Sequence, residues 1–247
     1  MFNLYAGGAD VKIDVVMITK NSLHPCLKRS LSSIFQNVPL NCLIIVDSFS
    51  TDGTIELIKK YRKGGIKIIQ KDCKRGKARE IGIKEVSTEW FAFIDSDVIL
   101  AENWFRDIKR HIKPKVGAIE GNVNNQKVDP KGRAYTNCTL IRTSLVEEIK
   151  IPDEMGVLED QYIRKHIENK GYVWLKVSYP CSIHKSQSDR LKDAFEVGRM
   201  AGKYRLFPFW KNFGVCFLIP IKYLKYGDSP RIYLSKLLGH IKGILER

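Results

Sequence analysis

Short apolar runs alternate with amphipathic segments through the first half of the chain. Four runs predict strands buried on both faces: 13–18, 42–46, 66–69 and 91–94. Apolar residues at helical spacing predict helices between them: 25–35, 54–61 and 78–86. This alternation is typical of an α/β fold, with a mostly parallel sheet covered by helices on both faces.

The pattern loosens after residue 119. Residues 121–133 are polar and rich in turn formers, which predicts a loop, and 134–141 are predicted to be extended. A helix is predicted at 158–169 and a strand at 172–177. From residue 188 onward the pattern is helical and amphipathic. We therefore expect an α/β domain, large enough to be a catalytic domain, over 1–187 and a helical extension over 188–247.

Composition excludes several classes of protein. The chain has 247 residues, of which 44% are hydrophobic, enough for a sizeable core. No run approaches the roughly 20 apolar residues of a membrane-spanning helix, and the first ten residues do not resemble a secretory signal. The six cysteines form no CxxC pair, so we expect free thiols rather than disulfides or zinc ligands. These features predict a cytoplasmic protein.

Positive charge is unevenly distributed. The 42 Lys and Arg against 27 Asp and Glu give a net charge of +15. From Lys185 onward, basic residues mix with aromatic and aliphatic ones, including the run 206–226. Helices of this makeup lie at membrane interfaces, which predicts a peripheral position on the cytoplasmic face of a membrane. The alternative is a tail that packs on the domain or on a second subunit, and the sequence leaves the oligomeric state open.

Two carboxylates follow the predicted strand 91–94, in the sequence Asp95-Ser96-Asp97. Ligands of such sheets bind beyond the carboxyl ends of the strands. Paired carboxylates there suit Mg²⁺ or Mn²⁺, which can bridge to a diphosphate. The structural alternative is that one Asp caps the next helix while the other is solvated.

Other polar residues stand at comparable positions. Asp47 ends the second predicted strand and could accept a hydrogen bond from a nucleotide base, whereas Asp52 is interpreted as a helix-capping residue. Basic residues 74–79 open a helix, an arrangement suited to anions. Asp160 could act as a general base, and His184 could join Asp97 as a metal ligand. The chain has neither a P-loop nor a GxGxxG motif.

Taken in order, these motifs resemble those of the family 2 glycosyltransferases, which have the GT-A fold. The resemblance covers roughly residues 11–185 and rests on the following segments: 18–21 (ITKN), 46–54 (VDSFSTDGT), 75–83 (RGKAREIGI), 93–98 (FIDSDV), 158–172 and His184. Ser48 and Glu80 stand where the family usually has Asp and Asn. The resemblance implies an inverting, hexosyltransferase-type enzyme that uses a nucleoside-diphosphate sugar.

The resemblance also implies roles for individual residues. Thr19 and Asp47 would hold the nucleotide base, with Asn21 nearby, and Arg79 would contact the nucleotide. Ser96 would lie beside the donor between Asp95, which faces the ribose and the metal, and Asp97, which binds the metal. Asp160 would be the catalytic base. The implied cofactor is Mn²⁺ or Mg²⁺, and the implied acceptor is a hydroxyl group on a glycan, lipid-linked if the tail binds a membrane.

Three alternatives remain. A polyprenyl- or dolichyl-phosphate sugar synthase has the same fold but uses a phosphate acceptor, which needs no general base. A phosphatase of the haloacid dehalogenase type has its DxD motif on the first strand, whereas here the strand is the fourth. A nucleic-acid-binding module would explain the positive charge but leaves the conspicuous aspartates without a role. We therefore expect no nucleic-acid partner.

Overall fold

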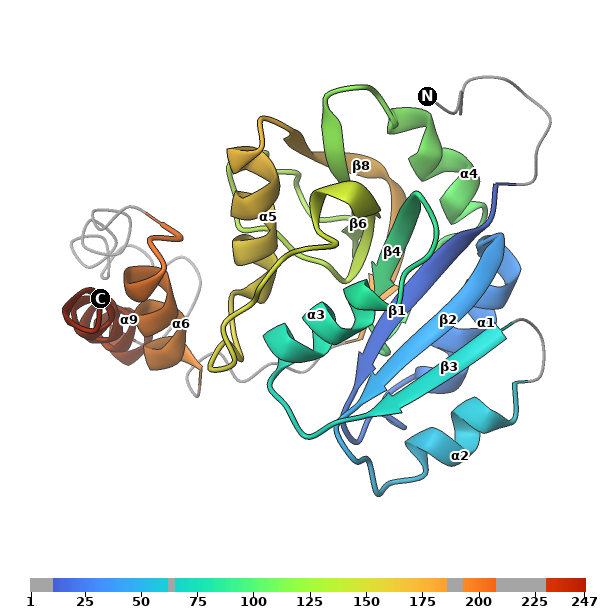
Figure 1. The fold of residues 1–247 in the computed structure, drawn as a ribbon, viewed down its shortest axis with the longest axis horizontal. Helices are drawn as coiled ribbons and strands as arrows, with labels where there is room; N and C mark the ends of the chain where they lie inside the picture. Colours follow the sequence, from blue (N-terminus) through green and yellow to red (C-terminus); the bar gives the residue numbers. More distant parts are fainter. Residues whose placement is uncertain (1–10, 62–64, 186–192, 208–229) are drawn as a thin grey trace.

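The computed structural model describes residues 11–61, 65–185, 193–207 and 230–247. Its centre is an eight-stranded sheet in the order β3-β2-β1-β4-β7-β6-β8-β5. Figure 1 shows this curled sheet with helices on both sides and two helices at its periphery. The architecture confirms the predicted α/β class.

The first half of the sheet is parallel. It contains β1 (Ile13–Thr19), β2 (Leu40–Asp47), β3 (Gly65–Gln70) and β4 (Trp90–Ile94). Every residue of β4 is buried, and the last five residues of β2 are also buried. The uniformly apolar runs therefore correspond to strands covered on both faces, as predicted.

Helices cover the two faces of this parallel half. On one face α1 (Leu27–Asn37) and α2 (Thr54–Lys59) pack against Val15 and Met17 of β1. On the other face α3 (Arg75–Lys84) packs against Val16. The α3 helix approaches β1 closely because Gly82 has no side chain, and a Cβ there would collide with Val16. The alternation of side chains along β1 thus separates two hydrophobic clusters.

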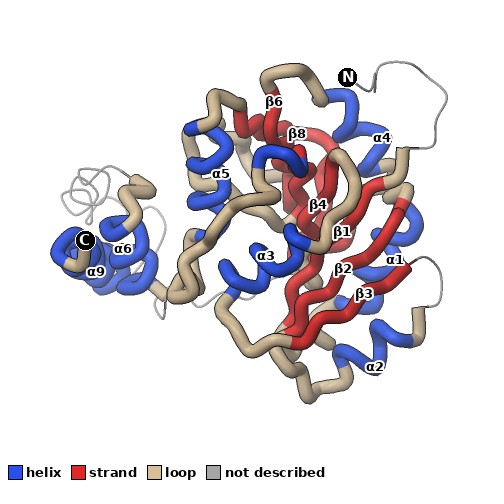
Figure 2. The backbone as a smooth tube through the Cα atoms, in the orientation of Figure 1, coloured by secondary structure: helices blue, strands red, loops and turns tan. Residues whose placement is uncertain are grey.

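The second half of the sheet is mixed. It contains β5 (Val98–Ile99), β6 (Val116–Val123), β7 (Cys138–Arg142) and β8 (Val173–His184). Strand β7 is antiparallel to both β4 and β6, whereas β6 and β8 are parallel. Figure 2 shows the strands of both halves continuing through one sheet. The remaining helices of this half are α4 (Trp104–Ile108) and α5 (Glu159–Asn169).

Two predicted boundaries in this half were wrong. The expected loop at 121–133 begins later, because β6 continues through Val123 and pairs there with β8. The Asn122 side chain, which suggested a loop, bonds the backbone of Gln126 at the end of the strand. The strand expected at 172–177 extends to His184 despite Pro180, and the β6–β8 register shifts between Glu120 and Asn122.

The C-terminal helices form a close pair. In Figure 1, α6 (Ala194–Lys203) and α9 (Pro230–Leu245) lie side by side, beyond α5. A Cβ on Gly198 would collide with the Lys236 carbonyl, and one on Gly239 would collide with that of Phe195. Glycines therefore allow the two backbones to touch. The predicted domain boundary at 187 and most of the aromatic run 206–226 lie outside the described residues, and within those residues no helix is suited to crossing a bilayer.

Candidate active site

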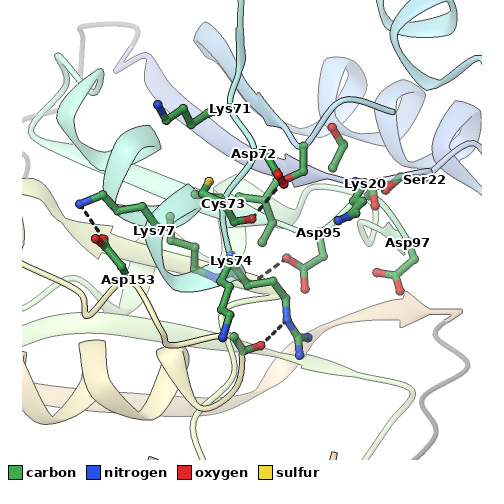
Figure 3. Close-up of a pocket in the computed structure, with 18 residues that line it drawn as sticks. Lys20, Ser22, Lys71, Asp72, Cys73, Lys74, Lys77, Asp95, Asp97 and Asp153 are labelled. Carbon is green, nitrogen blue, oxygen red and sulfur yellow. Dashed lines mark hydrogen bonds and ion pairs between the residues drawn. The ribbon is translucent and has the colours of Figure 1, made fainter. Parts of the chain in front are cut away.

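A cavity of about 870 Å³ opens where the parallel strands end. Thr19 closes β1, Ser48 follows β2, and Asp95, Ser96 and Asp97 follow β4, and all five residues line this strand-end cavity. Figure 3 shows Asp95 and Asp97 on one side of it, with Lys20 beside Asp97, and Lys71 and Lys77 on the other side. The structure thus brings the DxD motif and Thr19 to one edge of the sheet, as expected for a parallel α/β fold.

Strand pairing brings His184 to the DxD motif. Val98 of β5 lies opposite His184 of β8, and the Lys185 N–H donates to the Asp97 carbonyl. His184 Nε2 is consequently 3.3 Å from Asp97 Oδ2. The hydrogen bond to Asp97 raises the pKa of the His184 imidazole, which opposes the effect of its partial burial. Of the three residues predicted to bind a metal, the structure therefore pairs Asp97 with His184, whereas the Asp95 carboxylate contacts Arg79.

The chemistry of these side chains fits a divalent cation. Asp97 and His184 are each about one quarter exposed, at 24% and 25%, on the open side of the motif. Within the described ranges, no three His, Cys, Asp or Glu side chains form a group that could hold a metal ion. Mg²⁺ commonly uses one or two carboxylates together with substrate phosphates. The residues therefore suit a cation that arrives with a phosphate ligand.

A buried arginine connects the two halves of the sheet. Arg79 of α3 is 3% exposed, and its guanidinium lies 3.2 Å from Asp95, 3.6 Å from Glu159 and 3.7 Å from Asp160. Burial by itself would lower the pKa of Arg79, but the three carboxylates raise it above its ordinary value. Burial raises the pKa of Glu159, and so does the neighbouring Asp160. Arg79 thus neutralises carboxylates from β4 and α5 that would otherwise repel one another.

The predicted base has a defined orientation. Asp160 lies in the first turn of α5 and is 7% exposed. Its Oδ1 accepts a hydrogen bond of 2.6 Å from the Thr136 hydroxyl, and the same oxygen faces Arg79. Thr136 is buried in the irregular segment before β7. Sequence reasoning missed Thr136, because no local pattern marks a residue whose partner is 24 positions away.

Asp47 and Asn21 organise loops at the ends of β1 and β2. Asp47 is fully buried and accepts hydrogen bonds from Thr19, Gln70 and both the backbone and hydroxyl of Ser50. Burial opposes ionisation of Asp47, but these hydrogen bonds together lower the pKa of its carboxyl. Asn21 bonds the 50–51 segment through its own N–H and its Oδ1. Base binding by Thr19, Asn21 and Asp47 stays a prediction.

Two further interpretations concern Asp52 and the cysteines. Asp52 accepts hydrogen bonds from the N–H and the hydroxyl of Thr54 at the start of α2, although Gly53 occupies the N-cap position. The five cysteines within the described part of the chain are free thiols, and Cys216 lies outside it.

The opposite wall of the strand-end cavity is basic. Lys74, Arg75 and Lys77, at the start of α3, line it together with Lys71. Lys77 pairs with Asp153 at 3.2 Å, and Arg75 donates to the Gly156 carbonyl. Figure 3 shows the Lys77–Asp153 contact on the side away from Asp97. The helix therefore presents cations to a cavity whose other side carries the DxD carboxylates.

Comparison with protein families identifies one match. The model described as "Glycosyl transferase family 2" matches residues 14–159. This segment includes β1 to β7 and ends at Glu159, so it spans the strand-end cavity and the start of α5.

Curated relatives include two bacterial enzymes. The poly(ribitol-phosphate) beta-N-acetylglucosaminyltransferase TarP of Staphylococcus aureus is 31% identical over 131 residues, covering 50% of this chain and 39% of TarP. The chain therefore spans about two fifths of that relative's length. WfgD of Escherichia coli, a UDP-Glc:alpha-D-GlcNAc-diphosphoundecaprenol beta-1,3-glucosyltransferase, is 25% identical over 210 residues, covering 80% of this chain and 78% of WfgD.

Solved structures show the same fold. The mannosyltransferase PcManGT of Pyrobaculum calidifontis, in complex with GDP-Man and Mn²⁺, matches with a TM-score of 0.70 at 14% identity, over 96% of this chain and 88% of that one. Residues 1–349 of S. aureus TarS, in complex with UDP-GlcNAc, match with a TM-score of 0.62 at 19% identity, over 93% and 71% of the two chains.

Proposed function

Because the chain belongs to glycosyl transferase family 2, we propose that it transfers a sugar from a nucleoside-diphosphate sugar to a hydroxyl acceptor, with inversion at the anomeric carbon. The observation that carries this proposal is the position of Asp160 across Arg79 from the DxD motif. A group that accepts a proton and a group that binds a charged donor are thereby held within one buried cluster.

The site residues have three proposed roles: binding the metal, binding the donor and accepting a proton. Asp97, Asp95 and His184 would hold Mn²⁺ or Mg²⁺, which when bound neutralises charge on the diphosphate leaving group. Thr19, Asn21, Asp47, Arg79 and Ser96 would form or support the donor site. Asp160 would accept the proton of the attacking hydroxyl, with Thr136 fixing its carboxylate. A single displacement with this base produces inversion.

We propose a glycan acceptor, carried by a lipid, at the cytoplasmic face of a membrane. WfgD acts on a diphosphoundecaprenol-linked sugar, and TarP acts on poly(ribitol-phosphate). Helix α9 supports a membrane contact, since Leu234, Leu238 and Leu245 are 54%, 52% and 81% exposed with Lys242 among them. A polyprenyl-phosphate sugar synthase remains the second candidate, although the oriented Asp160 favours a hydroxyl acceptor.

Thermal shift tests the donor site. UDP-, GDP- and dTDP-sugars are added with and without Mn²⁺, and we expect at least one to stabilise the protein only when Mn²⁺ is present. Asp97→Ala should abolish this stabilisation, whereas Glu102→Ala, at an exposed position, should retain it. Asp160→Asn should still bind the donor but lose transfer to a lipid-linked acceptor, because the base is gone. Unchanged transfer in Asp160→Asn would remove the base assignment.

A negative result has a defined meaning. If no nucleotide sugar stabilises the protein with Mn²⁺, the proposed activity is wrong. Binding of RNA or DNA that weakens steeply with salt would then favour the nucleic-acid-binding alternative.

A further inference from the structure

A second cavity, of about 280 Å³, opens at the carboxyl end of β6. Strand β6 lies two positions from β4 in the sheet and runs in the same direction, so this β6 cavity opens at the same edge as the strand-end cavity. Its walls come from β6, from the segment before β7 and from β8, and they include Glu120, Asn122, Arg133, Tyr135, Asn137 and Lys176.

Three consecutive residues connect the β6 cavity to the catalytic groups. Tyr135 and Asn137 line the cavity, whereas the side chain of Thr136 between them bonds Asp160. The Asn137 carbonyl accepts the Asp95 N–H at 3.0 Å. A molecule in the β6 cavity would therefore lie on the same segment that orients the proposed base and the first Asp of the DxD motif.

Tyr135 offers a partly exposed ring that is held in place, with Arg133 and Lys176 each 5.5 Å from its centroid. The residue is 42% exposed, and its backbone N–H donates to the buried Glu120. Glu120 also accepts from Trp174 Nε1 at 2.7 Å and pairs with Lys176 at 3.1 Å. Since both oxygens of Glu120 bond fixed partners, the position of Tyr135 is set before any ligand arrives.

Asn137 supplies a buried side-chain oxygen that is available to accept a hydrogen bond. Asn137 is 5% exposed, and within the described ranges its Oδ1 has no hydrogen-bond partner. The same holds for Arg133 Nε, from another residue lining the cavity. Buried polar atoms of this kind are rare, and a ligand that bonds them removes the cost of leaving them unpaired.

The walls of the cavity carry charges of both signs. Three cations, Lys127, Arg133 and Lys176, lie among two carboxylates, Glu120 and Asp129, so the net positive charge is small, and Lys176 is already paired with Glu120. An aromatic face beside amide groups suits a ring with apolar C–H faces and hydroxyl edges. We propose that the β6 cavity binds a neutral pyranose unit of the acceptor glycan. The inference rests on the proposed transfer to a glycan and adds the place where the acceptor is held.

Saturation-transfer NMR with methyl pyranosides of glucose, galactose, mannose and N-acetylglucosamine tests this site. At least one should bind the wild-type protein, and Tyr135→Ala should weaken that binding at least about tenfold, as expected for the loss of an aromatic contact. Asn137→Leu should weaken it as well. Phe49→Ala removes another exposed aromatic residue, on the β2 side of the molecule, and should leave pyranoside binding unchanged.

Nucleotide binding, followed by thermal shift with Mn²⁺, separates this inference from the proposed function. Tyr135→Ala should retain the nucleotide response of the wild-type protein. If the nucleotide response is present but no pyranoside binds, or if Tyr135→Ala binds pyranosides normally, the β6 cavity is not an acceptor site. If glucose 1-phosphate binds more strongly than methyl glucoside, and Arg133→Gln abolishes this preference, the proposal that the ligand is neutral is wrong. Tyr135-dependent pyranoside binding without any nucleotide response would instead contradict only the proposed donor.

Discussion

The two halves of the sheet build their parts of the site differently. In the parallel half, Thr19 and Asp47 end apolar strands, and Asp95 directly follows one. In the mixed half, His184 arrives by strand pairing, and Asp160 depends on Thr136 from an irregular segment. The parallel half of the site is thus specified by local order along the chain, whereas the mixed half depends on contacts between distant segments.

Arg79 is the contact through which the two halves depend on each other. It belongs to α3 of the parallel half, yet two of its three carboxylate partners, Glu159 and Asp160, start α5. The guanidinium also lies over the Phe93 ring, at 4.8 Å from its centroid. Loss of this cation would leave three carboxylates close together without their shared partner. We therefore expect replacement of Arg79 to lower the stability of the fold more than the other changes described below.

Arg79→Met should therefore cost about 3–5 kcal/mol of unfolding free energy, the usual result of removing one partner from a buried charge cluster. Urea unfolding at pH 7 measures this cost. Arg106→Met provides a matched control, because Arg106 is 59% exposed and its partner Asp107 also pairs with Arg110. The control should change stability by less than about 1 kcal/mol. Equal effects of the two substitutions would show that Arg79 does not join the halves.

The sequence predicted most of the parallel half for a physical reason. Strands buried on both faces must be apolar throughout, so the polar residues Asp47, Asp95 and Asp97 stand out where the apolar runs stop. The order of strands and helices then brings those ends to one edge. Neither step requires knowledge of distant contacts.

The mixed half was less predictable because its pairing is not local. Residues Gly121 and Asn122 look like a loop, and only their neighbours β7 and β8 make them part of a strand. Thr136 and Tyr135 have no periodic signal, since their roles arise from α5 and β6. The close pairing of α6 with α9 was not predicted either, although its glycines were visible in the sequence.

Thr136→Val sharpens the comparison for the mixed half of the sheet. The substitution keeps the shape of the side chain but removes the hydrogen bond to Asp160, and hydrogen bonds to charged groups contribute about 1.5–3 kcal/mol. If Asp160 is the base, kcat should fall about tenfold to a hundredfold. The KM for the donor and the nucleotide thermal shift should not change, because Thr136 does not line the strand-end cavity.

Two further variants distinguish orientation from general packing. Thr136→Ser retains the hydroxyl and should restore most of kcat. Thr143→Val removes a comparable hydrogen bond, to the Thr88 carbonyl, at a position away from the site, and should leave kcat unchanged. A kcat loss in Thr143→Val as large as that in Thr136→Val would indicate a structural effect in place of base positioning.

The smallest expected effect concerns the loop that joins the site to the C-terminal helices. Glu154 lies next to Asp153, which lines the strand-end cavity, and its carboxylate contacts Lys203, Tyr204 and Arg199. Because the Glu154 side chain is 31% exposed, its replacement by Gln should cost less than about 1 kcal/mol at pH 7. Thermal melts of the wild type, Glu154→Gln and the exposed control Glu147→Gln measure this difference.

The pH dependence of that difference tests the cause. Hydrogen bonds from Lys203 and Tyr204 lower the pKa of Glu154 from 4.5 to about 2 in the folded protein. A group whose folded pKa lies below its unfolded pKa stabilises the protein above the unfolded value, and this contribution is lost as the pH falls through the folded value. The difference in melting temperature between wild type and Glu154→Gln should therefore be constant from pH 6 to 8 and shrink below about pH 4.5. A difference that grows on acidification would mean that the charge of Glu154 does not hold the helices to the loop, and that the extension is fixed by its glycine contacts and packing alone.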